Sequence, residues 1–296
     1  MGFSFPDWES RREHEGLRDA WLASQDFAAG QLDGLEADCV LCGMRTTLQL
    51  RGNPAAPDLR EGLVCGHCGL NTRLRAALQL LRGQLAASAS LSQPPLRRLL
   101  ARLGLGGPPK PPEVYVTEQA TPTFVWMQKH LGAHLHGSEY EPDPGKRHAL
   151  TESLHSLGGT GEVVFRDLTA LDFADASLDA VASFDVLEHV PDYRAAIGEM
   201  ARVLKPGGAC VATFPFNDLP DTLVRARVGP DGEIEHIEPP EYHGDPISGG
   251  ILCFYHFGWD VLARFREAGF ARAHMVMPYS LEQAIPYGMW TLLAIR

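Results

Sequence analysis

The sequence lacks the features of a membrane or exported protein. No uncharged apolar run approaches the ~18 residues that a membrane-spanning helix needs. The first 16 residues carry acidic side chains where a signal peptide would have a basic segment followed by an apolar one. These absences predict a cytoplasmic protein with no membrane span.

Extremes of composition are missing as well. Apolar residues make up 45% of the 296 residues and charged residues 21%, as in a globular protein that buries a core. This balance excludes extensive disorder, a collagen and a coiled coil. The length fits one large domain or two domains of ordinary size.

The net charge of −11 is spread unevenly. Residues 1–112 contain 13 basic and 11 acidic side chains, whereas residues 113–296 contain 13 basic and 26 acidic ones, a charge of −13. A surface of this charge repels polyanions, so the second half is not expected to bind nucleic acid in general. Between Arg73 and Lys110 lie seven basic residues and no acid. We expect a solvated helix face or a contact with the acidic half there, with a phosphate-bearing partner as the alternative.

A cluster of glycine and proline, GLGGPPKPP at 104–112, predicts a linker. Before it, residues 1–36 are expected to form one or two short polar helices. Residues 70–86 have leucines at helical spacing, and a second short helix is expected at 96–103. The prediction is a mostly helical N-terminal domain, residues 1–110, followed by a larger domain, residues 111–296.

The larger domain alternates predicted strands with helices. Thr121 and Pro122 suit the N-cap and first position of a helix. Such alternation favours a mostly parallel sheet covered by helices on both faces, with ligands beyond the carboxyl ends of its strands. The strands are expected at 114–118, 133–140, 161–168, 178–190, 209–216, 273–277 and 290–295.

Two CxxC pairs, each followed by glycine, predict a zinc site. The four residues are Cys39, Cys42, Cys65 and Cys68. Four thiolates complete a tetrahedral zinc shell, and the glycine after each pair allows a left-handed turn that directs backbone N–H groups toward the sulfurs. A redox CxxC would explain one pair but not the second. Because a four-cysteine shell has no open position, the zinc is expected to be structural.

The stretch from Asp167 reads DLTALDFADASLDAVASFDVLEHVPD and continues to ARVLKPGG at 201–208. It resembles the class I S-adenosylmethionine-dependent methyltransferases of the broad small-molecule group. That family has an acid after its third strand, a loop of the form LPF…SFD, then LEHV and RVLKPGG; here LDF and SLD replace LPF and SFD. The resemblance covers about 113–296. It implies an α/β fold, a Rossmann-like seven-stranded methyltransferase domain, with S-adenosylmethionine as cofactor.

The resemblance also implies roles for individual residues. Asp167 would accept a hydrogen bond from the adenine amino group, and the backbone of Leu168 would serve the ring edge. Glu139 would hold the two ribose hydroxyls, because a carboxylate offers two acceptors to adjacent donors. The residues expected beside the methionine part and the sulfonium are Ser183, Phe184 and Asp185.

The family's glycine-rich loop after the first strand is replaced here by residues 116–123, VTEQATPT, which contain no glycine. Those glycines let the backbone approach the cofactor, so this loop must have a different shape. Threonine and glutamine side chains, with the helix that begins after Thr121, could substitute for them. Glu118 could take the role of the loop acid.

Methyl transfer is an in-line displacement at a sulfonium and often needs a base. His189 and His256 are the candidate bases, with structural histidines as the alternative. The insertion 217–256 is expected to form a lid over the acceptor pocket, with a hairpin around GPDG. A less favoured hypothesis is a second metal site built from His236, His243 and His256.

The sequence therefore predicts an enzyme, an S-adenosylmethionine-dependent methyltransferase that acts on a small molecule or glycan precursor. Its zinc module would orient a substrate, a carrier or a second subunit. One alternative is an RNA methyltransferase, which the basic stretch favours and the acidic half opposes. The other is a catalytically inactive binding or assembly protein, which the glycine-free loop favours.

Overall fold

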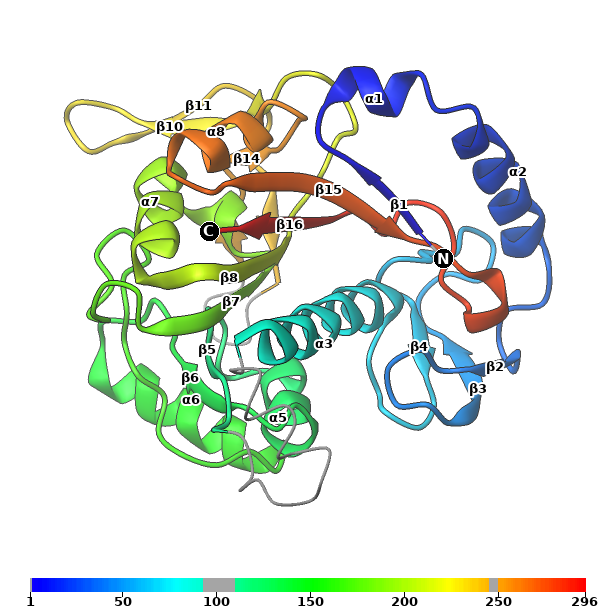
Figure 1. The fold of residues 1–296 in the computed structure, drawn as a ribbon, viewed down its shortest axis with the longest axis horizontal. Helices are drawn as coiled ribbons and strands as arrows, with labels where there is room; N and C mark the ends of the chain where they lie inside the picture. Colours follow the sequence, from blue (N-terminus) through cyan, green and yellow to red (C-terminus); the bar gives the residue numbers. More distant parts are fainter. Residues whose placement is uncertain (1, 93–109, 245–249) are drawn as a thin grey trace.

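The computed structural model describes residues 2–92, 110–244 and 250–296, with side chains from 2 to 88 in the first range (Figure 1). The short helix expected at 96–103 and most of the expected linker lie outside these residues. No helix in the described ranges is both long enough and apolar enough to span a membrane.

The centre of the fold is a seven-stranded sheet (Figure 1). Its strands, in spatial order, are β1 (Gly2–Phe5), β15 (Arg272–Pro278), β16 (Thr291–Ile295), β8 (Leu204–Thr213), β7 (Leu178–Phe184), β5 (Glu113–Val116) and β6 (His134–Gly137). The pairs among β6, β5, β7 and β8 are parallel, and the pairs among β8, β16, β15 and β1 are antiparallel. Five strands thus run one way and two the other, which confirms the mostly parallel sheet.

Helices cover both faces of the sheet, as expected. Successive side chains of a strand point to opposite faces, so Val114 and Val116 join one core while Tyr115 joins the other. The first core also contains side chains of α3 (Thr72–Ser92), α5 (Pro122–His130) and α6 (Pro144–Ser156). The second contains side chains of α7 (Tyr193–Val203) and α8 (Val261–Glu267). The predicted start of α5 is confirmed, because Thr121 caps it and Pro122 follows.

Both edges of the sheet differ from the prediction. The strand expected at 161–168 is wrong: only an isolated bridge between Glu139 and Phe165 remains. The side chain of Gln119 binds this segment instead, donating to the carbonyl of Glu162 (2.8 Å) and accepting from the N–H of Val164 (3.1 Å). At the other edge β1 pairs with β15. A segment expected to be helical therefore supplies the seventh strand.

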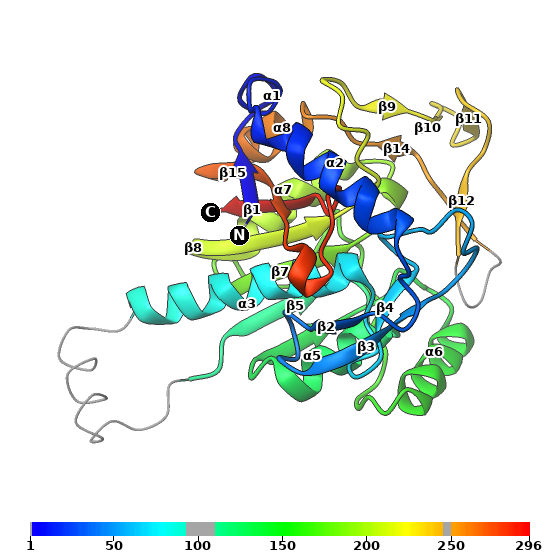
Figure 2. The ribbon, with the colours of Figure 1, turned by 90° about the vertical axis from the view of Figure 1, so that its right-hand side faces the viewer.

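The rest of the N-terminal region contains helices and strands. Helices α1 (Trp8–Arg12) and α2 (Gly16–Ala29) agree with the expectation, but a three-stranded antiparallel sheet follows. Its strands are β2 (Glu36–Asp38), β3 (Arg45–Leu50) and β4 (Leu63–Cys65). Figure 2 shows α3 lying between this small sheet and the large one. Leu48 of β3 and Leu81 of α3 lie in the same core as Val114, so segments on both sides of residue 110 share one core.

Arginines in the described part of the basic stretch form hydrogen bonds within the protein. Arg75 is fully buried and donates to the carbonyls of Gln283 (3.1 Å) and Ala284 (3.0 Å). Arg82 donates to the carbonyl of Leu41 (2.8 Å). Both guanidinium groups bind the protein's own backbone, and the contacts of Arg75 join the two halves as expected.

The insertion 217–256 is built from short antiparallel pairs. The hairpin expected around GPDG is confirmed by the pairing of β10 with β11. Two further pairs hold the rest of the insertion. The strands are β9 (Leu223–Val224), β10 (Ala226–Val228), β11 (Ile234–His236), β12 (Tyr242–His243), β13 (Ile251–Leu252) and β14 (Tyr255–His256); the short 3-10 helices are η1 (Leu187–His189) and η2 (Leu281–Gln283).

We predict that Gly137→Ala destabilises the fold by about 1–3 kcal/mol through overpacking. An added Cβ would lie 2.6 Å from Cγ of Gln119 and 2.7 Å from the ring of Phe124. Gly83→Ala is the matched control, because its Cβ would meet no atom within 4 Å and alanine favours a helix. Urea unfolding midpoints measure both, and equal midpoints for the two variants would contradict the prediction.

Candidate functional site

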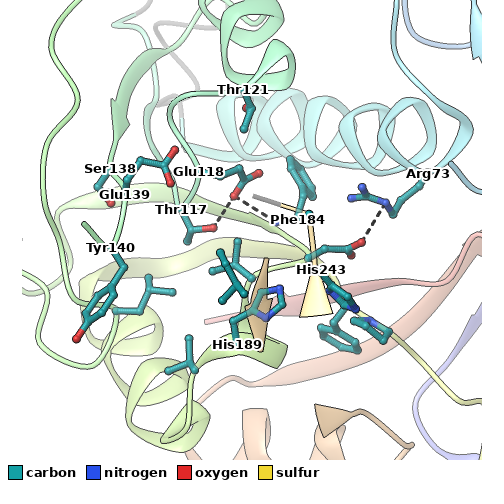
Figure 3. A pocket seen from close by; sticks show the side chains of 18 of the residues that line it. Arg73, Thr117, Glu118, Thr121, Ser138, Glu139, Tyr140, Phe184, His189 and His243 are labelled. Carbon is teal, nitrogen blue, oxygen red and sulfur yellow. Dashed lines mark hydrogen bonds and ion pairs between the residues drawn. The ribbon is translucent and has the colours of Figure 1, made fainter. Parts of the chain in front are cut away.

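A cleft of about 1520 Å³ opens at the carboxyl ends of the parallel strands (Figure 3). Glu118 follows β5, Glu139 follows β6 and Asp185 follows β7, and all three line the cleft. This is where a sheet of this type binds its ligands. The other predicted residues that line the cleft are Asp167, Leu168, Phe184, His189 and His256.

One predicted cofactor-binding residue is misplaced. Ser183 is fully buried and does not line the cleft. Its hydroxyl lies 3.1 Å from the hydroxyl of Thr117. Because strand side chains alternate, the next residue, Phe184, takes the position on the cleft wall. Ser183 therefore joins β7 to β5 behind the site.

The glycine-free loop is held by Glu139. Oε1 of this carboxylate accepts hydrogen bonds from the backbone N–H groups of Gln119 (2.8 Å) and Ala120 (2.7 Å). Charge-assisted bonds of this kind are about twice as strong as neutral ones. The carboxylate expected to hold ribose hydroxyls thus also fixes the loop beside it.

The threonine and glutamine side chains of this loop have different roles from those we expected. Ala120 and Thr121 line the cleft, and the hydroxyl of Thr121 accepts from the N–H of Phe124 at the start of α5. The Gln119 side chain instead binds the backbone near residue 163, outside the cleft lining. A glutamine substitute for the missing glycines inside the cleft is therefore wrong.

Glu118 is a carboxylate in a poorly solvated position. Its Oε2 accepts from the hydroxyl of Thr117 (2.6 Å) and from the N–H of Phe184 (3.4 Å). Its Oε1 is shielded from solvent and has no hydrogen-bond partner among the described residues. Burial raises the pKa of Glu118 to about 8, and Glu139 adds to the rise. A cationic ligand would relieve this cost.

Asp167 lies on the cleft wall, and one oxygen of its carboxylate already accepts hydrogen bonds from within the protein. Oδ1 accepts from the backbone N–H of Thr169 (2.8 Å) and from its hydroxyl (2.7 Å). These bonds fix the orientation of the carboxyl group. Leu168 lies beside it and lines the cleft as well.

Asp185 is bound by two arginines that the sequence reasoning did not single out as site residues. Arg60 donates to both carboxylate oxygens, at 2.8 and 3.0 Å, and Nε of Arg73 lies 3.4 Å from Oδ2. Burial acts to raise the pKa of Asp185, but the charges of Arg73 and Arg60 lower it overall. Both arginines line the cleft. Arg60 lies between the two cysteine pairs, so only its position in the zinc module could have indicated it.

The four cysteines of the predicted zinc site lie together. Cys39 and Cys68 have sulfurs 4.0 Å apart, as do Cys42 and Cys65, and all four sulfurs lie within 4.8 Å of one another. A tetrahedral zinc with bonds near 2.3 Å needs sulfurs about 3.8 Å apart. The glycine after each pair has the expected positive φ, 69° and 74°. The donor set and its spacing therefore fit a structural zinc.

A cluster of histidines and glutamates lies where the insertion 217–256 borders the cleft. His243 lies between two carboxylates, with Nδ1 3.4 Å from Oε1 of Glu188 and Nε2 3.1 Å from Oε1 of Glu241. His256 also reaches Glu241 (3.0 Å), and the rings of His189 and His243 are 4.9 Å apart. We call these five residues the histidine cluster. His236 is exposed and pairs with Ala226 in a hairpin, so the metal site expected from His236, His243 and His256 is wrong.

Comparison with known proteins identifies the central part of the chain. Residues 124–212 match the family described as methyltransferase domain. An uncharacterized methyltransferase of Mycolicibacterium gilvum (strain PYR-GCK) is 43% identical over 82 residues, 28% of this chain and 31% of that protein. One of Mycobacterium marinum (strain ATCC BAA-535 / M) is 43% identical over 74 residues, 25% of this chain and 28% of that protein. The chain thus spans about a third of the length of these relatives.

Among solved structures, an S-adenosylmethionine dependent methyltransferase from Mesorhizobium loti has a TM-score of 0.41 and 17% identity, over 66% of this chain and 96% of that one. The family match extends from α5 to β8. It contains Glu139, Asp167, Asp185 and His189, whereas Glu118 and His256 lie outside it.

We predict that the stability of the wild type, relative to Glu118→Gln, falls as the pH rises from about 4.5 to about 8. In this range the unfolded chain has lost the proton that the folded chain retains, because burial raises the pKa of Glu118 in the fold. The slope is at most about 1.4 kcal/mol per pH unit. Urea unfolding at several pH values measures it, with the exposed Glu152→Gln as control. A difference that does not change with pH would contradict the prediction.

Proposed function

We propose that this chain, whose residues 124–212 carry a methyltransferase domain, is an S-adenosylmethionine-dependent methyltransferase of the cytoplasm. One observation carries the proposal: the carboxylates of Glu118, Glu139 and Asp167 converge on one cleft at the carboxyl ends of the sheet. None of the six cysteines forms a disulfide, in keeping with a reducing compartment.

The charges around the cleft fit the parts of the cofactor. S-adenosylmethionine carries a positive sulfonium, a positive amino group and a negative carboxylate. Glu118, which keeps its proton near pH 7 in the fold, would lose that proton to stabilise a positive group. Arg60 and Arg73, whose charges Asp185 and Glu61 already balance, would donate hydrogen bonds to a negative group. Glu139 and Asp167 supply acceptors for hydroxyl and amino groups. When bound, the cofactor would supply an electrophilic methyl group.

The chain's own part in the chemistry is to align an acceptor and take its proton. In-line displacement requires the acceptor atom close to the methyl group and opposite its leaving sulfur, which a shaped cleft achieves. His189 and His256 both line the cleft, and a neutral imidazole suits proton removal near pH 7. We propose these two as the groups nearest to the acceptor.

We propose that the acceptor is a small molecule or glycan precursor. Tyr242, Ile251 and Asn217 of the insertion form part of the cleft wall, so acceptor choice falls to this segment. The alternative of an RNA acceptor loses its main support, because the described arginines of the basic stretch bind groups within the protein.

We further propose a structural zinc on the four cysteines. It would hold the loop between β3 and β4, from which Arg60 reaches Asp185. The same module contributes Arg73 at the start of α3. Zinc would thereby keep two cationic side chains at the edge of the cleft, and the module would form part of the substrate site.

We predict that the zinc-loaded protein binds S-adenosylmethionine and that Glu139→Gln and Asp167→Ala weaken binding at least about tenfold. Each change removes a charged hydrogen-bond acceptor, which contributes about 1.5–3 kcal/mol. Glutamine at 139 keeps an oxygen that can accept from Gln119 and Ala120, so the loop retains its anchor. Calorimetric titration with the cofactor and with its demethylated product measures the affinities.

The control for this titration is Glu152→Gln, which removes an exposed carboxylate on α6, away from the cleft lining. Absence of binding by folded wild-type protein would reject the proposed cofactor and favour a binding or assembly protein. Equal affinities for wild type and both site variants would reject the residue roles while keeping the cofactor.

We predict that the protein keeps about one zinc per chain after treatment with EDTA, and that Cys42→Ser loses it, because four thiolates bind zinc far more tightly than three. Cys210→Ala is the matched control, since Cys210 is buried in the other core. Metal analysis by mass spectrometry measures the content. Wild-type protein without zinc, or a Cys42→Ser variant that retains it, would contradict the prediction. Loss of zinc should also lower cofactor affinity, because Arg60 loses its support.

A further inference from the structure

A second set of metal-ligand side chains lies beside the cleft, apart from the four cysteines. One ligand atom each from Glu188, His189 and His243 lie within 4.8 Å of one another. Oε1 of Glu188 is 3.4 Å from Nδ1 of His243 and 3.7 Å from Nε2 of His189. A tetrahedral metal with bonds near 2.1 Å needs ligand atoms about 3.4 Å apart. These three atoms are therefore close to metal-binding positions.

The environment of Glu188 is a second indication of a bound cation, independent of the spacing of the ligand atoms. Its side chain is fully buried, and neither carboxylate oxygen has a hydrogen-bond partner among the described residues. Its two histidine neighbours are near enough for ion pairing, yet they do not provide hydrogen-bond geometry. A buried carboxylate without hydrogen bonds is strongly unfavourable unless it is paired or binds a metal.

His189 is held in the orientation of a metal ligand. Its Nδ1 lies 2.9 Å from the carbonyl oxygen of Leu252. Because a carbonyl can only accept, Nδ1 carries the proton, and in the neutral ring the lone pair is on Nε2. Nε2 is the atom near Glu188. Histidines that bind metals are commonly fixed in this way, by a hydrogen bond from the other ring nitrogen.

His243 is supported in a similar way. Its Nε2 lies 3.1 Å from Oε1 of Glu241, while Nδ1 is the atom near Glu188. Glu241 is itself held by His256 (3.0 Å) and by Arg225 (3.2 Å). A carboxylate bound to the far nitrogen of a histidine increases the ability of the near nitrogen to bind a metal.

We propose that Glu188, His189 and His243 bind a divalent transition metal through one oxygen and two nitrogens. Two histidines and one carboxylate form a ligand set that leaves further positions open, unlike the closed shell of four cysteines. His189 and His243 line the cleft (Figure 3), so the open positions face it. The site is a property of these residues and does not depend on the proposed methyl transfer.

The metal would also define the class of acceptor, an extension that rests on the proposed function. Open positions on such a metal bind oxygen, so the acceptor would carry a hydroxyl or carboxylate group. The lone pair of His189 would then be used by the metal. His256 would remain as the base, because Nδ1 carries its lone pair when Nε2 donates to Glu241.

A neighbouring set, Glu241, Cys253 and His256, is less suited to a metal. The thiol of Cys253 donates to the carbonyl of Tyr255 (3.3 Å). Oε1 of Glu241 is already shared by two histidines. Glu241 orients His243 and therefore acts as a positioning residue.

The test is a metal titration of protein without a histidine tag, stripped with EDTA so that the cysteine-bound zinc remains. Calorimetry with Zn²⁺ should detect about one further equivalent per chain. Glu188→Gln and His243→Ala should each weaken this binding more than about 100-fold, and Glu241→Gln about 10–100-fold, as expected for an outer ligand. His236→Ala, an exposed histidine of the same insertion, should leave it unchanged.

A second measurement separates the two metal sites. Co²⁺ added to the zinc-loaded protein should give a spectrum without the intense sulfur-to-metal bands of a thiolate site, since the cluster's ligands are nitrogen and oxygen. Retention of the cysteine zinc and of circular dichroism shows that each variant is folded. Wild-type protein that takes up no second equivalent, or a second equivalent that survives both Glu188→Gln and His243→Ala, would overturn the proposal whether or not the protein binds S-adenosylmethionine.

Discussion

The ion pairs of Asp185 with Arg60 and Arg73 connect the module that carries the four clustered cysteines to the methyltransferase domain. Asp185 follows β7 with a φ of 57°, and the hydroxyl of Thr213 donates to its carboxylate as well. Glu61 binds both arginines in turn. Removing one partner of this partly buried group would leave the charges of the others uncompensated. These ion pairs therefore hold the module at the edge of the cleft.

The loop after β5 shows how a cleft of this kind can be built without glycine. Glycines in such a loop allow close approach of the backbone to a ligand. Here the carboxylate of Glu139 binds two successive N–H groups and holds the loop from the next strand. Gly137 in β6 leaves the space into which the side chains of Gln119 and Phe124 pack.

Local patterns in the sequence predicted local structure well. The cap at Thr121, helix α7, the hairpin around GPDG and the spacing of the cysteines all depend on residues near one another in the chain. Most of the acids that follow strands also lie at the cleft, because parallel strands end at a common edge.

The errors come from interactions between distant residues. The strand expected at 161–168 is replaced by bonds to Gln119, and β1 is a strand because β15 offers an unpaired edge. Arg60 reaches Asp185 across 125 positions in the chain. Ser183 was misplaced by a single residue, which in a strand moves the side chain to the opposite face. Spacing along a sequence carries little information about any of these.

The pairing of β1 with β15 also has a consequence for how the chain reaches this fold. Gly2 lies opposite Pro278, so the two strands of this ladder are far apart in the order of synthesis. On the ribosome, β1 must remain without its partner until nearly all of the sheet has been translated, and closing so large a loop is slow. During that interval the edge of β15, rich in methionine, is open to other strands. The pairing of β1 with β15 is therefore a late folding step. Until it occurs, the edge of β15 is exposed to aggregation, and β1 then protects it.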